Sequence, residues 1–141
     1  MENKTTDELT NQLKKADRIE SYIDTNKDEF LTDSIADLLN KLLIKKDLKK
    51  SDVVKDSNLH RTYVYEIFNG DKTPSRDKIL AIAFAMRLTL DETQVLLKRS
   101  GNRELYSRDR RDSIIMFALD KKKSLIDCNI LLSDSTEEIL K

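Results

Sequence analysis

The side chains best suited to chemistry lie in the segment 60–69. If this segment is helical, its polar residues share one side, opposite the apolar Val64, Ile67 and Phe68. An arginine can donate two hydrogen bonds to guanine, a threonine can contact the thymine methyl, and a glutamate can accept from the cytosine amino group. The face could therefore read base-pair edges, or it could simply be a solvated helix surface. Its members are Arg61, Thr62, Tyr65, Glu66 and Asn69.

This helix is predicted to be the second of a closely joined pair. Val53 and Val54 form an apolar pair on a first short helix, residues 50–56, and Ser57-Asn58-Leu59 interrupts the run. Asn58 suits a turn with positive φ, since asparagine tolerates that conformation better than most residues. The second helix spans 60–68, and Gly70 stands where a glycine ends a helix. Two short helices joined in this way are typical of a helix-turn-helix DNA reader.

The remaining apolar pattern predicts an all-α chain. The 141 residues include only two glycines and one proline, whereas sheet proteins need more turn residues. Apolar residues at helical spacing predict a core-facing helix over 33–46 and a further helix after Pro74-Ser75. More helices are expected over 91–100, over 110–121 and from 124 onward. We predict a five-helix core with the domain limits 31–90, an N-terminal helical arm, 1–30, and a C-terminal helical extension, 91–141.

The arm has a weaker pattern than the core. Leu9, Leu13 and Ala16 share a face that Ile19, Tyr22 and Ile23 continue, so a helix is expected over 6–29. The apolar stripe is thin, and such a helix is stable only if it lies on another surface.

Charge is segregated along the chain although the net charge is zero. Residues 1–31 hold 5 basic and 8 acidic side chains, and residues 124–141 hold 1 and 4. Residues 32–88 hold 11 and 8, and residues 89–123 hold 9 and 6. The central part is therefore +6 and each end is −3, which permits a basic working face with acidic flanks. Ordinary mixed surface charge on the two ends is the plain alternative.

With these residues in place, Leu48 to Leu90 resembles the phage-repressor class of helix-turn-helix domains, the Xre/Cro type. The resemblance rests on the helix opening at Lys49-Lys50, the turn at Leu59 and the ending Phe68-Asn69-Gly70. It continues through Lys72-Thr73-Pro74-Ser75 to the apolar Ile79, Ile82 and Ala83. The chain departs from the class in having Lys50, Val54 and Asn58 where Gln, Ala and Gly are usual. The order of arm, domain and RRD-containing tail is similar to a group of bacterial regulators.

The resemblance implies specific contacts with DNA. Helix 60–68 is expected to enter the major groove, with Arg61, Thr62 and Glu66 as the leading base contacts. Tyr65 shares that face and joins the base-contacting set. The class places phosphate contacts at four positions, occupied here by Lys50, Tyr63, Asn69 and Lys72. Lys49, His60 and Arg76 are weaker candidates for phosphate contact.

Other sites are not expected. The chain has one histidine, His60, and one cysteine, Cys128, with no supporting partner for catalysis or metal binding. Glycine-rich phosphate loops are absent from the sequence. We predict no enzyme activity, no metal and no cofactor. No apolar run approaches a membrane span and no signal peptide is recognised, so a cytoplasmic protein is expected.

We therefore predict a sequence-specific double-stranded DNA-binding regulator, bacterial or prophage, and a repressor rather than an activator. A domain of this size contacts little DNA, so a homodimer on two half-sites is expected, paired through the terminal helices. Two alternatives remain open. The fold could serve as a protein-interaction module with its acidic ends on a partner protein, or the chain could be the antitoxin half of a toxin pair. An arginine-rich cluster in the tail could contact phosphate or the acidic arm: Arg99, Arg103, Arg108, Arg110 and Arg111.

Overall fold

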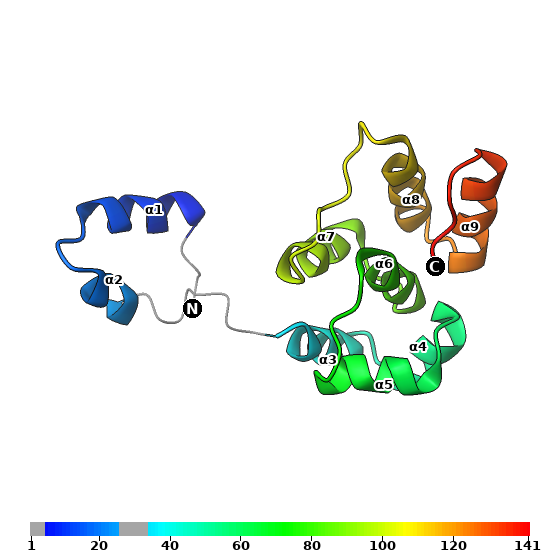
Figure 1. Cartoon of the computed structure of the whole chain (residues 1–141), viewed down its shortest axis with the longest axis horizontal. Coiled ribbons are helices and arrows are strands. Elements are labelled where there is room, and N and C mark those ends of the chain that lie inside the picture. Colours follow the sequence, from blue (N-terminus) through cyan, green and yellow to red (C-terminus); the bar gives the residue numbers. More distant parts are fainter. Residues whose placement is uncertain (1–4, 26–33) are drawn as a thin grey trace. The chain divides into compact units, whose positions relative to one another are not determined.

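The computed structural model describes residues 5–25 and 34–141. Within them the chain forms nine α-helices and no strand, which confirms the predicted all-α class. The chain divides into two compact units, Met1–Thr32 and Asp33–Lys141. Figure 1 traces the helices in chain order.

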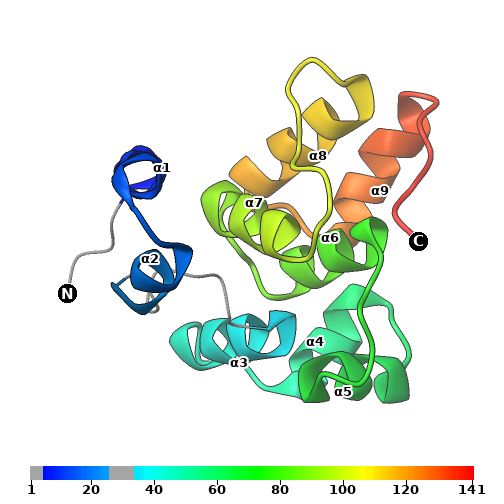
Figure 2. The same ribbon diagram turned by 60° about the vertical axis from the view of Figure 1, so that its left-hand side comes forward.

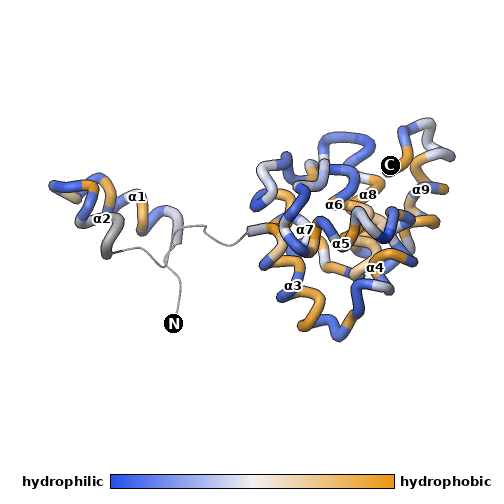
Figure 3. The backbone as a smooth tube through the Cα atoms, turned by 60° about the horizontal axis from the view of Figure 1, so that its bottom comes forward, coloured by the Kyte–Doolittle hydropathy of each residue, from blue (hydrophilic) through white to orange (hydrophobic). Residues whose placement is uncertain are grey.

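The first unit holds α1 (Thr6–Lys15) and α2 (Ile19–Thr25). Thr5 and Glu8 form a capping box at the start of α1, in which the Thr5 hydroxyl accepts from the Glu8 amide at 3.1 Å. No residue of α1 is buried, and hydrophilic and apolar segments alternate along both helices (Figure 3). The single helix expected over 6–29 is instead two helices, because the chain is extended at Ala16. The last part of that expected helix, 26–29, lies outside the described residues.

The second unit begins with the helix-turn-helix core. It comprises α3 (Ile35–Lys45), α4 (Lys50–Ser57), α5 (Arg61–Asn69), α6 (Arg76–Ala85) and α7 (Leu90–Arg99). The five expected helices are therefore confirmed. Each begins after a residue in extended conformation, and Ser34 and Thr89 accept a hydrogen bond from the third helical amide.

Helix α6 forms the centre of this unit. Every residue from Ile79 to Met86 is buried, as expected for a helix that is apolar on all sides. It packs against α4, α7 and α9, and in Figures 1 and 2 it lies between α4 and the C-terminal helices. Through α6 the hydrophobic core is continuous from Leu39 to Leu140. The C-terminal helices therefore share the core of the helix-turn-helix.

The C-terminal extension contains α8 (Arg110–Asp120) and α9 (Leu125–Asp134). Two matching arginine clamps fasten it to α6. Arg76 on α6 makes a bidentate ion pair with Asp112 on α8, at 2.8 and 3.0 Å, and donates to the carbonyls of residues 103 and 104. Arg111 on α8 makes a bidentate pair with Asp77 on α6, at 3.0 and 3.1 Å, and donates to the carbonyls of residues 138 and 139.

Three of the five tail arginines have carboxylate partners within the second unit. Arg111 is fastened to Asp77, Arg110 lies 3.6 Å from Glu137, and Arg103 lies within 4.0 Å of Asp109 and Asp112. These pairs lie within the second unit. Arg76, a weaker phosphate candidate, is likewise committed to Asp112, whose side chain is 1% exposed.

Candidate nucleic-acid interface

The turn before α5 is formed as the sequence indicates. Asn58 ends α4 in the left-handed conformation, with φ of 58°. The buried Ser57 hydroxyl accepts a hydrogen bond from the Leu59 amide at 3.3 Å, which tightens the reversal. His60 stands at the N-cap of α5 but its side chain makes no capping hydrogen bond.

The end of α5 is fixed by two devices. Gly70 is left-handed, with φ of 85°, so a side chain there would strain the backbone. The Asn40 amide on α3 donates to the Phe68 carbonyl at 2.9 Å and to the Ala36 carbonyl at 2.8 Å. A carbonyl near the helix end is thus satisfied by another helix. Val64, Ile67 and Phe68 are buried, which leaves the opposite side of α5 outward.

The outward side brings the predicted residues together in two groups. The first, the Tyr65 cluster, contains Lys50, Arg61 and Tyr65. The Arg61 guanidinium lies 5.2 Å from the Tyr65 ring centre and its Nη2 donates to the Tyr65 hydroxyl at 3.4 Å. Lys50 Nζ lies 5.4 Å from the same ring. Two cations from two helices are therefore held near one half-buried ring by cation–π attraction.

The second group, the Tyr63 cluster, contains Tyr63, Glu66, Lys72 and Lys78. Lys72 Nζ lies 5.8 Å and Lys78 Nζ 5.9 Å from the Tyr63 ring centre. Lys72 also pairs with Glu66 at 3.3 Å. Sequence reasoning missed Lys78, which lies on α6. The only signal for it was a lysine in the first turn of the helix that follows Pro74-Ser75.

The two remaining predicted residues, Thr62 and Asn69, are exposed on α5. The eight predicted contacts therefore lie on α4, α5 and the segment that follows α5. The two clusters contain Lys50, Arg61, Lys72 and Lys78 against the single carboxylate of Glu66. A convex helix face with excess positive charge can approach double-stranded DNA, whose phosphates are negatively charged and whose base edges are exposed in the grooves.

Other reactive residues are placed elsewhere. Cys128 on α9 is fully buried, and burial raises the pKa of its thiol to about 12 although the nearby Arg111 opposes the shift. Among the described residues, no group of three His, Cys, Asp or Glu side chains could hold a metal ion. Within the same residues, none of the helices has the length and apolar character needed to cross a membrane.

Comparison with known families agrees with this geometry. Residues 38–93 match the Cro/C1-type HTH DNA-binding domain. This segment runs from α3 into the first turn of α7 and includes both clusters. The chain thus contains a Cro/C1-type helix-turn-helix DNA-binding domain, which supports its assignment to DNA-binding regulators. Searches of curated proteins and of solved structures gave no match.

Proposed function

We propose that the chain is a sequence-specific transcriptional repressor that places α5 in the major groove of double-stranded DNA. The observation that carries the proposal is the position of Arg61, Thr62 and Glu66 on the outward side of a helix that belongs to a DNA-binding domain. These three side chains, with Tyr65, would contact base edges. Lys50, Tyr63, Asn69 and Lys72 would contact phosphates and set the register. The repressor is expected to act in the bacterial cytoplasm and to be encoded by the bacterium or by a prophage.

A homodimer would place two such helices on half-sites about 34–36 Å apart. The outward faces of α8 and α9 support this pairing. Phe117 is 49% exposed and Ile130 is 52% exposed. Phe117 lines a hollow of about 210 Å³ together with Ile114 and Leu131. An exposed apolar patch of this kind suits a two-fold contact, in which the same patch of each copy meets the other.

Selection of bound duplexes from a random pool tests the proposal. The wild-type chain should enrich a defined sequence, and Arg61→Ala should relax the preference at one or two positions. A bidentate arginine–guanine contact contributes about 1–3 kcal/mol, so affinity for the best site should fall about 5- to 150-fold. An unchanged preference would remove Arg61 from the base-reading set. Failure of the wild-type chain to enrich any sequence would contradict sequence-specific reading.

A protein-interaction module is the second candidate. The Glu66–Lys72 pair favours it, because a carboxylate on the outward side of α5 neutralises a cation that phosphate would otherwise meet. An antitoxin role would keep the same DNA contacts and add a partner protein. Both candidates predict a stable complex with a protein, whereas the repressor predicts selective duplex binding by the chain alone.

A further inference from the structure

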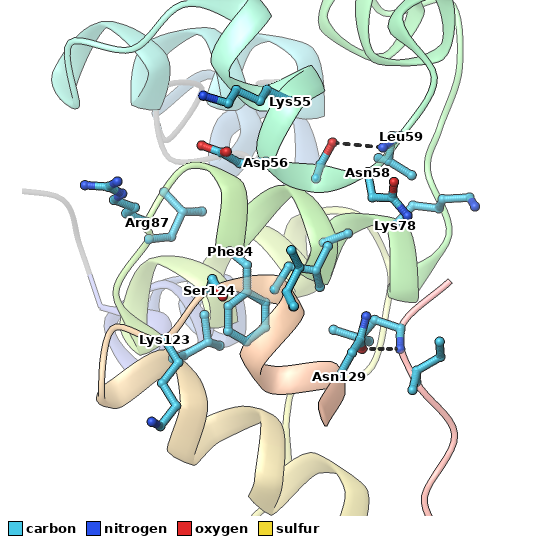
Figure 4. A pocket seen from close by; sticks show the side chains of 18 of the residues that line it. Lys55, Asp56, Asn58, Leu59, Lys78, Phe84, Arg87, Lys123, Ser124 and Asn129 are labelled. Carbon is cyan, nitrogen blue, oxygen red and sulfur yellow. Dashed lines mark hydrogen bonds between the residues drawn. The ribbon is translucent and has the colours of Figure 1, made fainter. Parts of the chain in front are cut away.

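A groove in the second unit lies outside the predicted DNA-contacting set. It has a volume of about 1190 Å³ and runs between the end of α4, the α4–α5 turn, α6, α9 and the C-terminal segment. None of the eight predicted contact residues lines it. Figure 4 shows the labelled side chains around the groove, with the Phe84 ring between them. Buried Phe84, Leu119 and Leu125 form part of an apolar floor.

The groove wall is strongly basic. Among the described residues, the only carboxylate side chain that lines the groove is Asp56. Within the described part of the chain, none of the lining cations has a carboxylate within ion-pairing distance. These cations come from α4, α6, two helix ends and the C-terminal segment: Lys55, Lys78, Arg87, Lys122, Lys123 and Lys141.

Two of these cations occupy strained backbone positions. Arg87 has φ of 55° and Lys122 has φ of 58°, a conformation that glycine or asparagine adopts at lower cost at a helix end. Each follows a helix that lines the groove, α6 for Arg87 and α8 for Lys122. Arginine and lysine therefore occupy two positions at the groove whose backbone conformation glycine or asparagine would adopt at lower cost. The same left-handed conformation occurs at the ends of other helices, at Asp47, Asn58 and Thr136, so the conformation itself serves helix termination and only the choice of a basic residue is particular to the groove.

The distribution of charge and the size of the groove indicate the kind of occupant. A small anion has one or two charged groups and needs a few converging cations, whereas these cations are spread over five parts of the chain. The volume also exceeds the roughly 300–1,000 Å³ of ordinary small-molecule sites. An amphipathic helix with an acidic face would bury its apolar side on the floor and present carboxylates to the surrounding cations. We propose that this groove docks an acidic amphipathic helix of a partner protein.

The first test uses a defined probe and the full chain. The probe is a fluorescent peptide with leucines on one helical face and glutamates on the other, beside a scrambled peptide of the same composition. The designed peptide should bind more tightly than the scrambled one. In ¹H–¹⁵N spectra, the amide signals of residues 55–59 and 122–126 should shift. Shifts confined to other residues, or equal binding of both peptides, would overturn the proposal.

Glycine substitution provides a variant that should not unfold. Arg87→Gly with Lys122→Gly removes two cations and relieves two strained positions, so thermal stability should be retained or raised. Peptide affinity should fall roughly tenfold at low salt, about threefold for each cation.

Two control variants change residues outside the groove lining. Thr136→Gly relieves a strained backbone position, and Lys98→Gln with Lys121→Gln removes two exposed cations. Both controls should bind as the wild type does. A loss of affinity in the controls equal to that of the glycine variant would overturn the site.

Two other occupants are outcomes of the same experiment. Dodecanoate tests a small amphipathic anion, and random duplex tests nucleic acid. If either shifts the signals of residues 122–126 while the designed peptide does not, the groove is not a helix-docking site. Lys78 lines the groove and also belongs to the Tyr63 cluster, so it is left unchanged in every variant used here. The groove shares no residue with the eight predicted DNA contacts, so loss of peptide binding with retained duplex selection would affect this proposal alone.

Discussion

The ion pair between Glu66 and Lys72 determines how two predicted DNA contacts can act. In the free chain their atoms lie 3.3 Å apart, with Glu66 30% exposed and Lys72 54% exposed. Lys72 must leave or share this pair before it can give its full charge to a phosphate. Glu66 in turn must be released before it can accept from cytosine. The pair thus opposes non-specific binding and favours a site that satisfies both partners.

Glu66→Gln should therefore strengthen binding to random duplex. The change removes a negative charge from the outward side of α5 and frees Lys72, so affinity at low salt should rise about two- to fivefold, as for an exposed ion pair. Fluorescence anisotropy on labelled random duplex measures this. Asp134→Asn, an exposed change of the same charge on α9, serves as the control. Weaker binding by Glu66→Gln would show that Glu66 aids contact with DNA of any sequence.

At the scale of elements, Glu92 links α7 to α3. Burial disfavours its charge, but hydrogen bonds from Lys46, the Thr89 amide and Lys45 outweigh that cost and lower the pKa from 4.5 to about 2. The lysine contacts are 2.8 and 3.1 Å long. A carboxylate with a lowered pKa stabilises the fold above pH 4.5. That stabilisation is lost as the pH falls from 4.5 toward 2.

Glu92→Gln tests this linkage. Glutamine can keep the capping box with Thr89 but loses both ion pairs. The free energy of unfolding should fall by about 1–2 kcal/mol at pH 7, and the difference should disappear near pH 2. Urea unfolding at the two pH values measures it. A difference that stays constant with pH would mean that the carboxylate charge contributes nothing.

The clamps between α6 and α8 predict a larger effect. Asp112 is buried, pairs with Arg76, and also accepts from the Tyr106 amide at 3.0 Å. Asp112→Asn keeps the shape of the side chain but leaves the Arg76 cation without its partner. The free energy of unfolding should fall by roughly 3 kcal/mol, measured by urea unfolding beside Asp134→Asn. A loss no larger than that of the control would contradict the structural role of the clamp.

Sequence reasoning located the elements because helical periodicity and caps are local signals. The stripe of α3, the turn at Asn58 and the end at Gly70 all depend on neighbouring residues. The break between α1 and α2 was missed, since Leu9, Leu13 and Ala16 fit a continuous helix. Partners distant in sequence could not be assigned either. The spacing of Arg76 and Arg111 does not reveal that each meets an aspartate on the other helix.

At the scale of the whole molecule, dimerisation through α8 and α9 can be tested directly. Phe117→Ser with Ile130→Ser should shift a dimer toward monomer and weaken operator binding, because it removes the exposed apolar residues of the proposed contact. Light scattering coupled to size-exclusion chromatography measures the mass. Val95→Ser changes an apolar residue of α7 that is 47% exposed and should leave the mass unchanged. An unaltered dimer in the double variant would place the contact elsewhere.

The candidate site was only partly predictable from sequence. The outward residues of α5 follow from the helical period and the buried Val64, Ile67 and Phe68. Their mutual contacts do not, because Lys50 and Lys78 reach the two tyrosines from neighbouring helices. The groove beside the α4–α5 turn was not predicted, since five separate parts of the chain contribute its cations.

Salt titration of binding to random duplex DNA tests the central claim most directly. Of the four predicted phosphate contacts per copy, only Lys50 and Lys72 are cations that neutralise phosphate, each with a slope of about −0.9. The logarithm of affinity should therefore fall with the logarithm of salt with a slope of about −1.8, or about twice that for a dimer. Lys50→Ala with Lys72→Ala should reduce the slope by about 1.8 per copy. Absence of measurable binding at low salt would contradict the account, as would a slope that these substitutions leave unchanged.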